Sequence, residues 1–202
     1  MVRISLMLLL IPVILYLRVY RIDGNSMNYG LTNGDIVITT KRFDTIERGE
    51  LFVIDHPDDP EGRLYVKRCT ATPSDKFFEK ERIFYLQLEG NATLTKQVAQ
   101  TYLLPYIQTE KGSFLKEPYG KYYGISHDLR LMVPKELKEL PLQSVPENHY
   151  MMMGDFRDNS ADSRFFGAVP QKWIHSKVIL ILKKPKSWKK LLEIKVADET
   201  SD

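Results

Sequence analysis

The chain has 202 residues, of which 43% are hydrophobic, and its formal net charge is +3. This composition is sufficient for one good hydrophobic core with a small appended lobe, and it excludes a disordered tail. A single cysteine, Cys69, excludes an intrachain disulfide and a cysteine-rich metal site, and the four histidines lack the spacing of zinc ligands. We therefore expect neither a metal nor a cofactor.

The N-terminal segment is strongly apolar, with fourteen uncharged residues between Arg3 and Arg18. A helix of that length is about 21 Å long, shorter than a hydrocarbon core of about 30 Å. A cleaved signal peptide, a membrane anchor and a buried core helix are the three alternatives. No small-x-small cleavage site follows, and both arginines can snorkel to the headgroups. We therefore favour a transmembrane anchor over residues 1–20.

Short runs of β-branched and aromatic residues, separated by turn residues, dominate the chain after Gly24. The runs cover residues 35–43, 49–57, 63–69, 82–90, 120–126, 148–155 and 176–182. This spacing predicts a mostly-β fold with an antiparallel, barrel-like sheet. The best helical pattern covers residues 133–140, where Pro134 suits a first helical turn. We assign residues 21–90 and 148–185 to the main β domain and residues 91–147 to a small inserted β-rich lobe.

The C-terminal part of the chain concentrates positive charge. Residues 171–190 contain seven lysines and no acidic residue, so the remaining chain has 22 basic against 26 acidic residues and a net charge of −4. Contact with anionic lipid and a solvated tail are both consistent with this run. Residues 186–202 are expected to form a tail that is first basic and then acidic.

Ser26, in the sequence Gly24-Asn25-Ser26-Met27, is a candidate nucleophile that has no base nearby in the sequence. By itself the stretch indicates only a turn, because glycine accepts positive φ and Asn and Ser bond to nearby backbone. A serine nucleophile needs a group that removes its proton. His56 in an Asp-rich turn is one candidate, and Lys67 is the alternative.

Lys67 belongs to the run Arg63–Cys69. Strand alternation places Tyr65, Lys67 and Cys69 on one face and Leu64, Val66 and Arg68 on the other. If the face of Lys67 is inward, burial disfavours the ammonium form and lowers the pKa, as a neutral amine base requires.

Residues 153–170 combine a high density of charge with apolar flanks. The charged members that we single out are Asp155, Arg157, Asp158, Asp162 and Arg164. A calcium loop counted from Asp158 fails, because its sixth and twelfth positions are Ser163 and Val169 instead of Gly and Glu. The mixture of signs predicts a loop held by its own ion pairs and able to orient a neighbouring group.

Taken together, five stretches resemble bacterial type I signal peptidase, the membrane-bound Ser/Lys endopeptidase that removes signal peptides. These are the apolar N-terminus, "GNSM" (24–27), "RGELFVIDHP" (48–57), "YVKR" (65–68) and "GDFRDNSADSRFFGAVP" (154–170). The last matches the family pattern G-D-N-R-D-N-S-x-D-S-R-x-x-G-x-V at every fixed position except Phe156. Two other departures are Tyr29 in place of a proline and "KRCTATPSD" after the lysine.

The resemblance implies roles for particular residues. Ser26 would be the nucleophile and Lys67 the general base, while the Ser160 hydroxyl would bind and orient the lysine amine. Asp155, Asp162 and Arg164 would support this arrangement. Gly24 supplies no hydroxyl to the oxyanion hole. Apolar residues would bind the small side chains before the cut: Met27, Leu31 and Tyr65 at the first site, and Tyr20, Ile22 and Val66 at the second.

The resemblance also implies partners and a location. Preproteins with signal peptides and the phospholipid bilayer would be the partners, with no nucleic acid. The location would be the bacterial cytoplasmic membrane, spanned once, with the catalytic domain on the outer side. Met151, Met152 and Met153 would then be either a membrane-dipping surface or a buried strand. A self-cleaving or conjugation-associated Ser/Lys peptidase and a catalytically silent relative are the alternatives in function.

Overall fold

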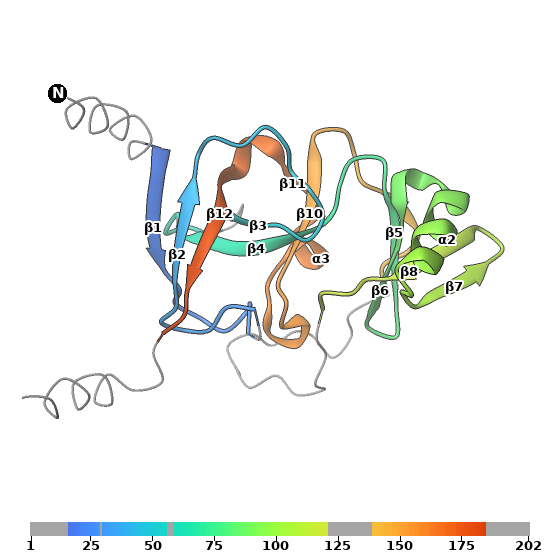
Figure 1. Ribbon diagram of the computed structural model, residues 1–202, viewed down its shortest axis with the longest axis horizontal. Helices are drawn as coiled ribbons and strands as arrows, with labels where there is room; N and C mark the ends of the chain where they lie inside the picture. The colour runs from blue at the N-terminus through green and yellow to red at the C-terminus, as the bar shows by residue number, and fades with distance from the viewer. Residues whose placement is uncertain (1–15, 29, 56–58, 121–138, 185–202) are drawn as a thin grey trace, which may run out of the picture.

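The computed structural model describes residues 16–28, 30–55, 59–120 and 139–184. Its larger sheet has seven strands, and each neighbouring pair is antiparallel (Figure 1). In spatial order the strands are β1 (Leu17–Arg21), β2 (Ile36–Thr40), β12 (Ile174–Leu182), β3 (Leu51–Asp55), β4 (Leu64–Ala71), β10 (His149–Met153) and β11 (Val169–Pro170). The predicted mostly-β, antiparallel architecture is confirmed.

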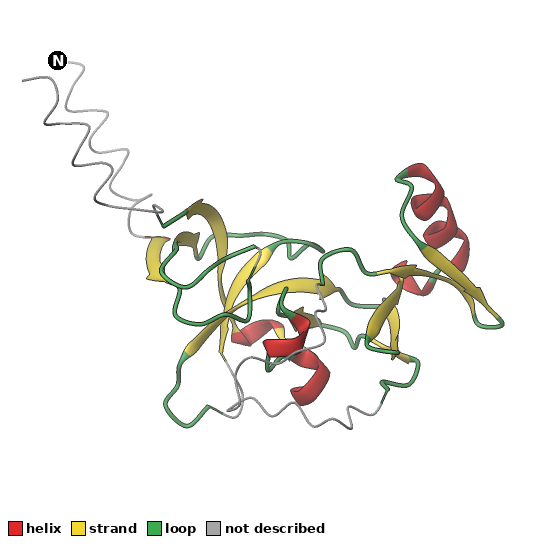
Figure 2. Ribbon diagram, turned by 90° about the horizontal axis from the view of Figure 1, so that it is seen from below, coloured by secondary structure: helices red, strands yellow, loops and turns green. Residues whose placement is uncertain are grey.

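A second antiparallel sheet has five strands. Their order is β7 (Tyr106–Thr109), β8 (Gly112–Lys116), β6 (Ile83–Gln87), β5 (Lys76–Lys80) and β9 (Gln143–Ser144). Helix α2 (Ala92–Thr101) contacts β8 and lies at the end of the molecule farthest from β1 (Figures 1 and 2). Its first turn is capped by Asn91, whose side chain accepts hydrogen bonds from the Thr93 and Leu94 amides.

Short helical segments complete the two sheets. The 3-10 helix η1 (Leu88–Gly90) precedes α2, and η3 (Gln171–Trp173) precedes β12. Between β10 and β11 the chain forms the 3-10 helix η2 (Arg157–Asn159) and the single-turn helix α3 (Ser163–Phe166). This connection carries the charged motif and is called the bracing loop, residues 154–166, below.

The border between the two sheets differs from the one that the sequence suggested. The second sheet begins at Lys76, so β5 and β6 do not pair with the larger sheet, although they lie within residues 21–90. Strand alternation identifies a strand but not its partner, which explains the difference. Helix α2 was not predicted. Most of the predicted helix 133–140, and the predicted strand from residue 121 to 126, lie outside the described residues.

Strand β1 changes the interpretation of the N-terminal segment. Leu17 to Arg21 pair with Thr40 to Ile36 along the whole strand, so residues 17–20 belong to the sheet and not to a helical anchor. Interstrand hydrogen bonds to β2 satisfy the backbone groups on one edge of β1. Residues 1–15 lie outside the described residues, and within the described ranges no helix is long and apolar enough to cross a membrane.

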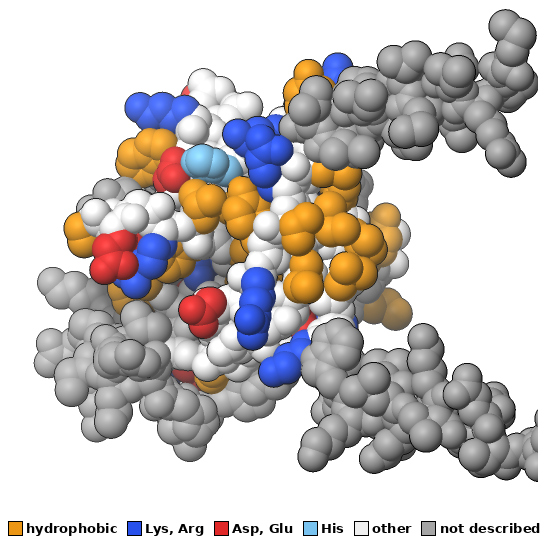
Figure 3. Space-filling model, turned by 90° about the vertical axis from the view of Figure 1, so that its left-hand side faces the viewer, with side chains coloured by type: hydrophobic (Ala, Val, Ile, Leu, Met, Phe, Trp, Pro, Cys, Tyr) orange, Lys and Arg blue, Asp and Glu red, His pale blue; other side chains and the backbone are white. Residues whose placement is uncertain are grey.

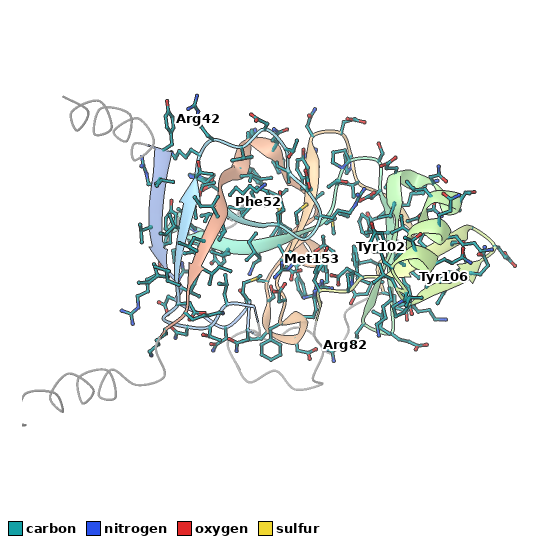
Figure 4. The ribbon with its side chains drawn as sticks, in the orientation of Figure 1. Arg42, Phe52, Arg82, Tyr102, Tyr106 and Met153 are labelled. Atoms are coloured by element: carbon teal, nitrogen blue, oxygen red, sulfur yellow. The ribbon has the colours of Figure 1, made fainter. Side chains whose placement is uncertain are left out.

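The hydrophobic core joins the two sheets. One cluster combines residues of β4 and β10 with Phe77, Phe84 and Leu86 of the second sheet. Met151, Met152 and Met153 are at most 1% exposed, and Met153 is labelled near the centre of the molecule in Figure 4. The buried-strand alternative for the three methionines is therefore correct, and a membrane-dipping surface made of them is excluded.

Candidate active site

Ser26 and Lys67 lie side by side although 41 residues separate them in the sequence. The Lys67 amine donates a hydrogen bond to the Ser26 hydroxyl, and the Nζ–Oγ distance is 2.8 Å. Lys67 projects from β4 and is 1% exposed, whereas Ser26 is half-buried at the end of the cleft described below. The structure thus brings an accessible hydroxyl to a buried amine.

Burial lowers the pKa of Lys67 from its ordinary value of 10.5 to about 8. The negative charges of Asp162 and Asp155 favour the ammonium and reduce the shift, while Arg164 adds to it. The aromatic ring of Tyr65 also lies near the amine, with its centroid 5.6 Å from Nζ. Burial therefore has the larger effect, and an appreciable fraction of the amine is neutral near pH 8.

Lys67 lies on the face of β4 that points into the protein, which is the condition under which a lowered pKa was expected. Cys69, two residues further along the strand, is fully buried, and burial raises the pKa of its thiol to about 12. Tyr65 is only half-buried because it borders the cleft. Burial of the amine itself is the physical origin of the lowered lysine pKa.

A tight turn presents Ser26. The amides of Gly30 and Leu31 both donate to the Met27 carbonyl, and the Asn28 amide donates to the Asn25 carbonyl. The Ser26 carbonyl in turn accepts from the Phe156 amide at 3.0 Å, which attaches the turn to the bracing loop. Gly24 has a φ of +124°, a conformation that glycine adopts without strain.

Gly154 is the point of closest approach between the bracing loop and Ser26. A Cβ atom at this position would collide with the Ser160 hydroxyl and the Ser26 carbonyl oxygen. Only glycine therefore allows the loop to pack against the turn that carries Ser26. Gly154 was not among the predicted site residues, although it is the first residue of the charged motif.

Asp162 and Arg164 form a buried ion pair, with 2.9 Å between Arg164 Nε and Asp162 Oδ1. Burial opposes ionisation of Asp162, but Arg164 and the Gly154 amide together hold the pKa of its carboxyl below the ordinary value. Arg164 also donates to the Arg157 carbonyl at 2.7 Å. Asp162–Arg164 is an ion pair within the loop, as predicted. The other charged residues of the motif pair outside the loop, which was not predicted: Asp155 with Arg68, Arg157 with Glu117 and Asp158 with Arg82.

Asp155 contacts Arg68, the neighbour of Lys67 on β4. The two side chains form a bidentate pair with N–O distances of 2.7 and 2.6 Å, and Arg68 also donates to the Gly49 carbonyl. Bidentate arginine–carboxylate pairs restrict geometry strongly. Asp155 therefore connects the bracing loop to the strand that carries Lys67, through an arginine that the sequence analysis did not single out.

Ser160 does not make the contact expected of it. Its hydroxyl is buried next to Gly154 and forms no hydrogen bond with any described residue, whereas the Lys67 amine bonds to Ser26. The expected bond from Ser160 to the lysine is therefore absent from the structure. The reason is geometric, because the amine turns to Ser26 while the Ser160 hydroxyl faces the backbone of Gly154.

A cleft of about 520 Å³ ends at Ser26. Its walls come from the end of β1 and the turn that carries Ser26 on one side and the start of β4 on the other, with Val53 of β3 also contributing. Of the residues predicted to bind substrate, the lining includes Tyr20, Ile22, Met27, Tyr65 and Val66. All five lie within reach of a peptide that enters the cleft.

Leu31 is the predicted substrate-binding residue that does not line the cleft. It is fully buried and packs with Val37 and Leu51 in a core cluster. The hydrogen bond from its amide to the Met27 carbonyl turns the chain inward at this point. Leu31 therefore packs in the core behind the residues that line the cleft. The alternative base, His56, lies outside the described residues.

Comparison with known proteins gives a consistent picture. The family model described as "Signal peptidase, peptidase S26" matches residues 1–183. Signal peptidase I of Aquifex aeolicus is 29% identical over 86% of this chain and 80% of its own length. Signal peptidase I V of Bacillus subtilis is 27% identical over 76% of this chain and 78% of its own.

Of two further relatives, one is a longer protein and the other is a solved structure. Signal peptidase I of Buchnera aphidicola from Acyrthosiphon pisum is 28% identical over 72% of this chain, which spans 56% of that protein. A crystal structure of a signal peptidase I from Enterococcus faecalis covers 69% of this chain and 100% of its own, with 19% identity and a TM-score of 0.37.

Proposed function

Because this chain belongs to the signal peptidase S26 family, we propose that it is a signal peptidase I that cleaves signal peptides from exported preproteins with a Ser26–Lys67 dyad. The observation that supports the dyad most directly is the 2.8 Å contact between the Ser26 hydroxyl and a buried lysine amine. A nucleophile within hydrogen-bond distance of its base is the arrangement that covalent catalysis requires.

The reaction starts from neutral Lys67. Its amine removes the proton of the Ser26 hydroxyl as the oxygen attacks the scissile carbonyl, which gives a tetrahedral intermediate and an ammonium. The ammonium then donates its proton to the leaving amine of the mature protein. The remaining acyl-enzyme is hydrolysed by a water molecule that Lys67 deprotonates, and the signal peptide leaves with a free carboxylate.

Stabilisation of the oxyanion relies on backbone. The N–H of Ser26 is the first donor, as in other acyl-transfer sites where the nucleophile's own amide contributes. Gly24 has no side chain that could donate, so the second donor is another backbone amide or a water molecule. The Phe156–Ser26 backbone bond keeps the turn in place while charge develops on the carbonyl oxygen.

The substrate binds in the cleft as an extended strand. Residues 64–67 of β4 pair with β3 on one side, and β10 pairs with β4 only from Arg68 onward. Among the described strands, β1 pairs with β2 alone. Both walls of the cleft thus offer backbone groups to an added strand. Apolar side chains such as Ile22 and Val66 favour Ala-x-Ala ends by shape.

An apolar outer face supports the bilayer as a partner. Five apolar side chains from the adjacent strands β1, β2 and β12 are between 37% and 65% exposed: Val19, Ile36, Ile179, Leu180 and Leu182. Figure 3 shows hydrophobic side chains gathered on this side of the molecule. Exposed apolar patches commonly mark contact with protein or membrane. We place the enzyme on the outer side of the bacterial cytoplasmic membrane, with the apolar N-terminal segment as its anchor.

The direct test uses the full chain in detergent with a preprotein that carries an Ala-x-Ala site. We expect the wild type to cut after this site, and both Ser26→Ala and Lys67→Ala to reduce the rate by about 10⁴-fold or more. His56→Ala, which removes the alternative base, should retain activity. Full activity of Lys67→Ala would refute the dyad, and an inactive wild type with several preproteins would favour a catalytically silent relative.

A further inference from the structure

Two arginines set the position of the bracing loop beside Ser26. Arg68 forms the bidentate pair with Asp155, and Arg157 donates from Nε to the Gly154 carbonyl at 2.9 Å. Gly154 and Asp155 directly precede Phe156, whose amide bonds to Ser26. The two guanidinium groups therefore control the stretch of backbone that meets the nucleophile.

A segment of the second sheet's polypeptide contacts both arginines. Residues 117–120 ("EPYG") follow β8 and run back from the second sheet toward the bracing loop (Figure 1). Glu117 accepts a hydrogen bond from Arg157 Nη2 at 2.5 Å, and the two side chains are each 1% exposed. The ring of Tyr119 stacks over the Arg68 guanidinium, 5.1 Å from its centroid.

The fit around Arg157 is close on more than one side. A Cβ atom at Gly120 would lie 2.5 Å from Arg157 Cζ, so the guanidinium packs against a backbone with no side chain. Glu117 is itself fixed, because its carboxylate accepts hydrogen bonds from the Tyr119 and Gly120 amides. Residues 117–120 therefore form a fixed binding site for the Arg157 guanidinium and not a chance surface contact.

We propose that Glu117 is a positioning residue for the catalytic centre: through Arg157 and Gly154 it holds the bracing loop against the Ser26–Lys67 pair. The inference rests on the proposed peptidase function of that pair. It gives the second sheet a part in turnover. Every residue that lines the cleft comes from residues 20–27, 53 or 63–66, so the second sheet has no part in substrate binding there.

This division predicts which kinetic constant changes. Loss of the Glu117 charge leaves Arg157 buried beside a neutral acceptor and loosens the Gly154 backbone. A small misplacement near reacting groups reduces the rate of the chemical step, up to about a hundredfold. We expect Glu117→Gln to lower kcat by about tenfold, equivalent to about 1.4 kcal/mol, and to leave KM within about twofold.

The experiment compares kcat and KM of the full chain in detergent on a peptide substrate, together with the thermal unfolding midpoint of each variant. Glu110→Gln, the same substitution at an exposed position in the turn between β7 and β8, is the matched control and should behave as wild type. In a double-mutant cycle, Glu117→Gln with Arg157→Gln should lose no more activity than Arg157→Gln alone, because the two act as a unit.

Gly120→Ala is the second variant, since it displaces the Arg157 guanidinium while the Glu117 carboxylate stays. It should also lower kcat with KM unchanged. This variant tests the contact between Arg157 and residues 117–120 even if Glu117→Gln does not fold. The inference is wrong if folded Glu117→Gln keeps wild-type kcat, if KM changes instead of kcat, or if the cycle is additive. Failure of the proposed function has a different signature, in which wild type does not cleave or Lys67→Ala does.

Discussion

The two sides of Ser26 are built from opposite kinds of residue. On one side is the cleft, which is open and largely apolar, with Ile22, Met27 and Val66 in its walls. On the other is the bracing loop, which buries Asp162 and Arg164 almost completely. Apolar walls select a substrate by its shape, whereas buried charges hold a geometry and modulate a pKa.

This contrast assigns separate tasks to separate parts of the sequence. Changes in the bracing loop should alter stability, turnover and pH dependence, with little effect on which peptide is accepted. Changes in the cleft walls should alter peptide preference, with little effect on Lys67. A variant that mixes these effects would break the comparison.

The largest expected effect in this comparison is that of Asp162→Asn. The substitution leaves the buried Arg164 guanidinium without its charged partner, and such a loss destabilises proteins by about 3–5 kcal/mol. Chemical denaturation of the folded enzyme measures the change in unfolding free energy. Glu61→Gln, in an ion pair with Arg63 whose side chains are 69% and 62% exposed, is the control and should cost far less. Equal losses in the two variants would show that the buried pair has no special role.

The next effect is the pH dependence of cleavage. Lys67 must be neutral to accept the Ser26 proton, and its pKa is about 8, so kcat/KM should rise about tenfold per pH unit below that value and then level off. Between pH 6 and pH 8 the neutral fraction of Lys67, and with it kcat/KM, rises about fiftyfold. Asp162 favours the ammonium, so Asp162→Asn should move the midpoint to lower pH. A profile that is flat from pH 6 to 9 would exclude Lys67 as the base.

The lowered pKa of Lys67 also determines how its contribution to protein stability changes with pH. The folded pKa is lower than the ordinary 10.5, so the unfolded chain binds more protons between about pH 8 and pH 10.5. The contribution of Lys67 to the free energy of unfolding therefore rises with pH across this window and is constant below it.

The smallest effect is expected in the cleft. Val66→Phe adds volume to a wall of the cleft and should lower kcat/KM for an Ala-x-Ala peptide by about tenfold, through KM, without moving the pH midpoint. Val19→Phe makes the same change on the outer face of β1, where the side chain is 65% exposed, and should have no effect on a soluble peptide. A change in kcat alone for Val66→Phe would contradict the division of tasks.

The sequence was most informative where a local pattern decides the structure. Alternation along residues 63–69 placed Lys67 and Cys69 on one face of a strand, and both side chains are buried. Turn residues correctly separated most strands of the larger sheet. The density of opposite charges around Asp162 predicted a loop held by its own ion pairs, and this is correct for Asp162 and Arg164 but not for the other charged residues of the loop. Each of these features depends on residues that are close together in the chain.

Long-range partners were beyond such patterns. Glu117 lies 40 residues from Arg157, and nothing near either residue indicates that they pair. The strand predicted within residues 82–90 was assigned to the main β domain, whereas β6 belongs to the second sheet, and the cause is the same, because pairing is decided by tertiary contacts. The orientation of the Ser160 hydroxyl depends on the position of Gly154, which no sequence pattern specifies.

Because Cys69 is buried, its chemical modification can report local opening of the sheet around β4. Cys69 is the only sulfhydryl in the chain, it lies on the same strand as Lys67, and a pKa of about 12 leaves almost no thiolate at neutral pH. Alkylating reagents can reach it only when β4 separates from its neighbours. The rate at which Cys69 is modified therefore measures how often β4, the strand that carries Lys67, detaches from the sheet.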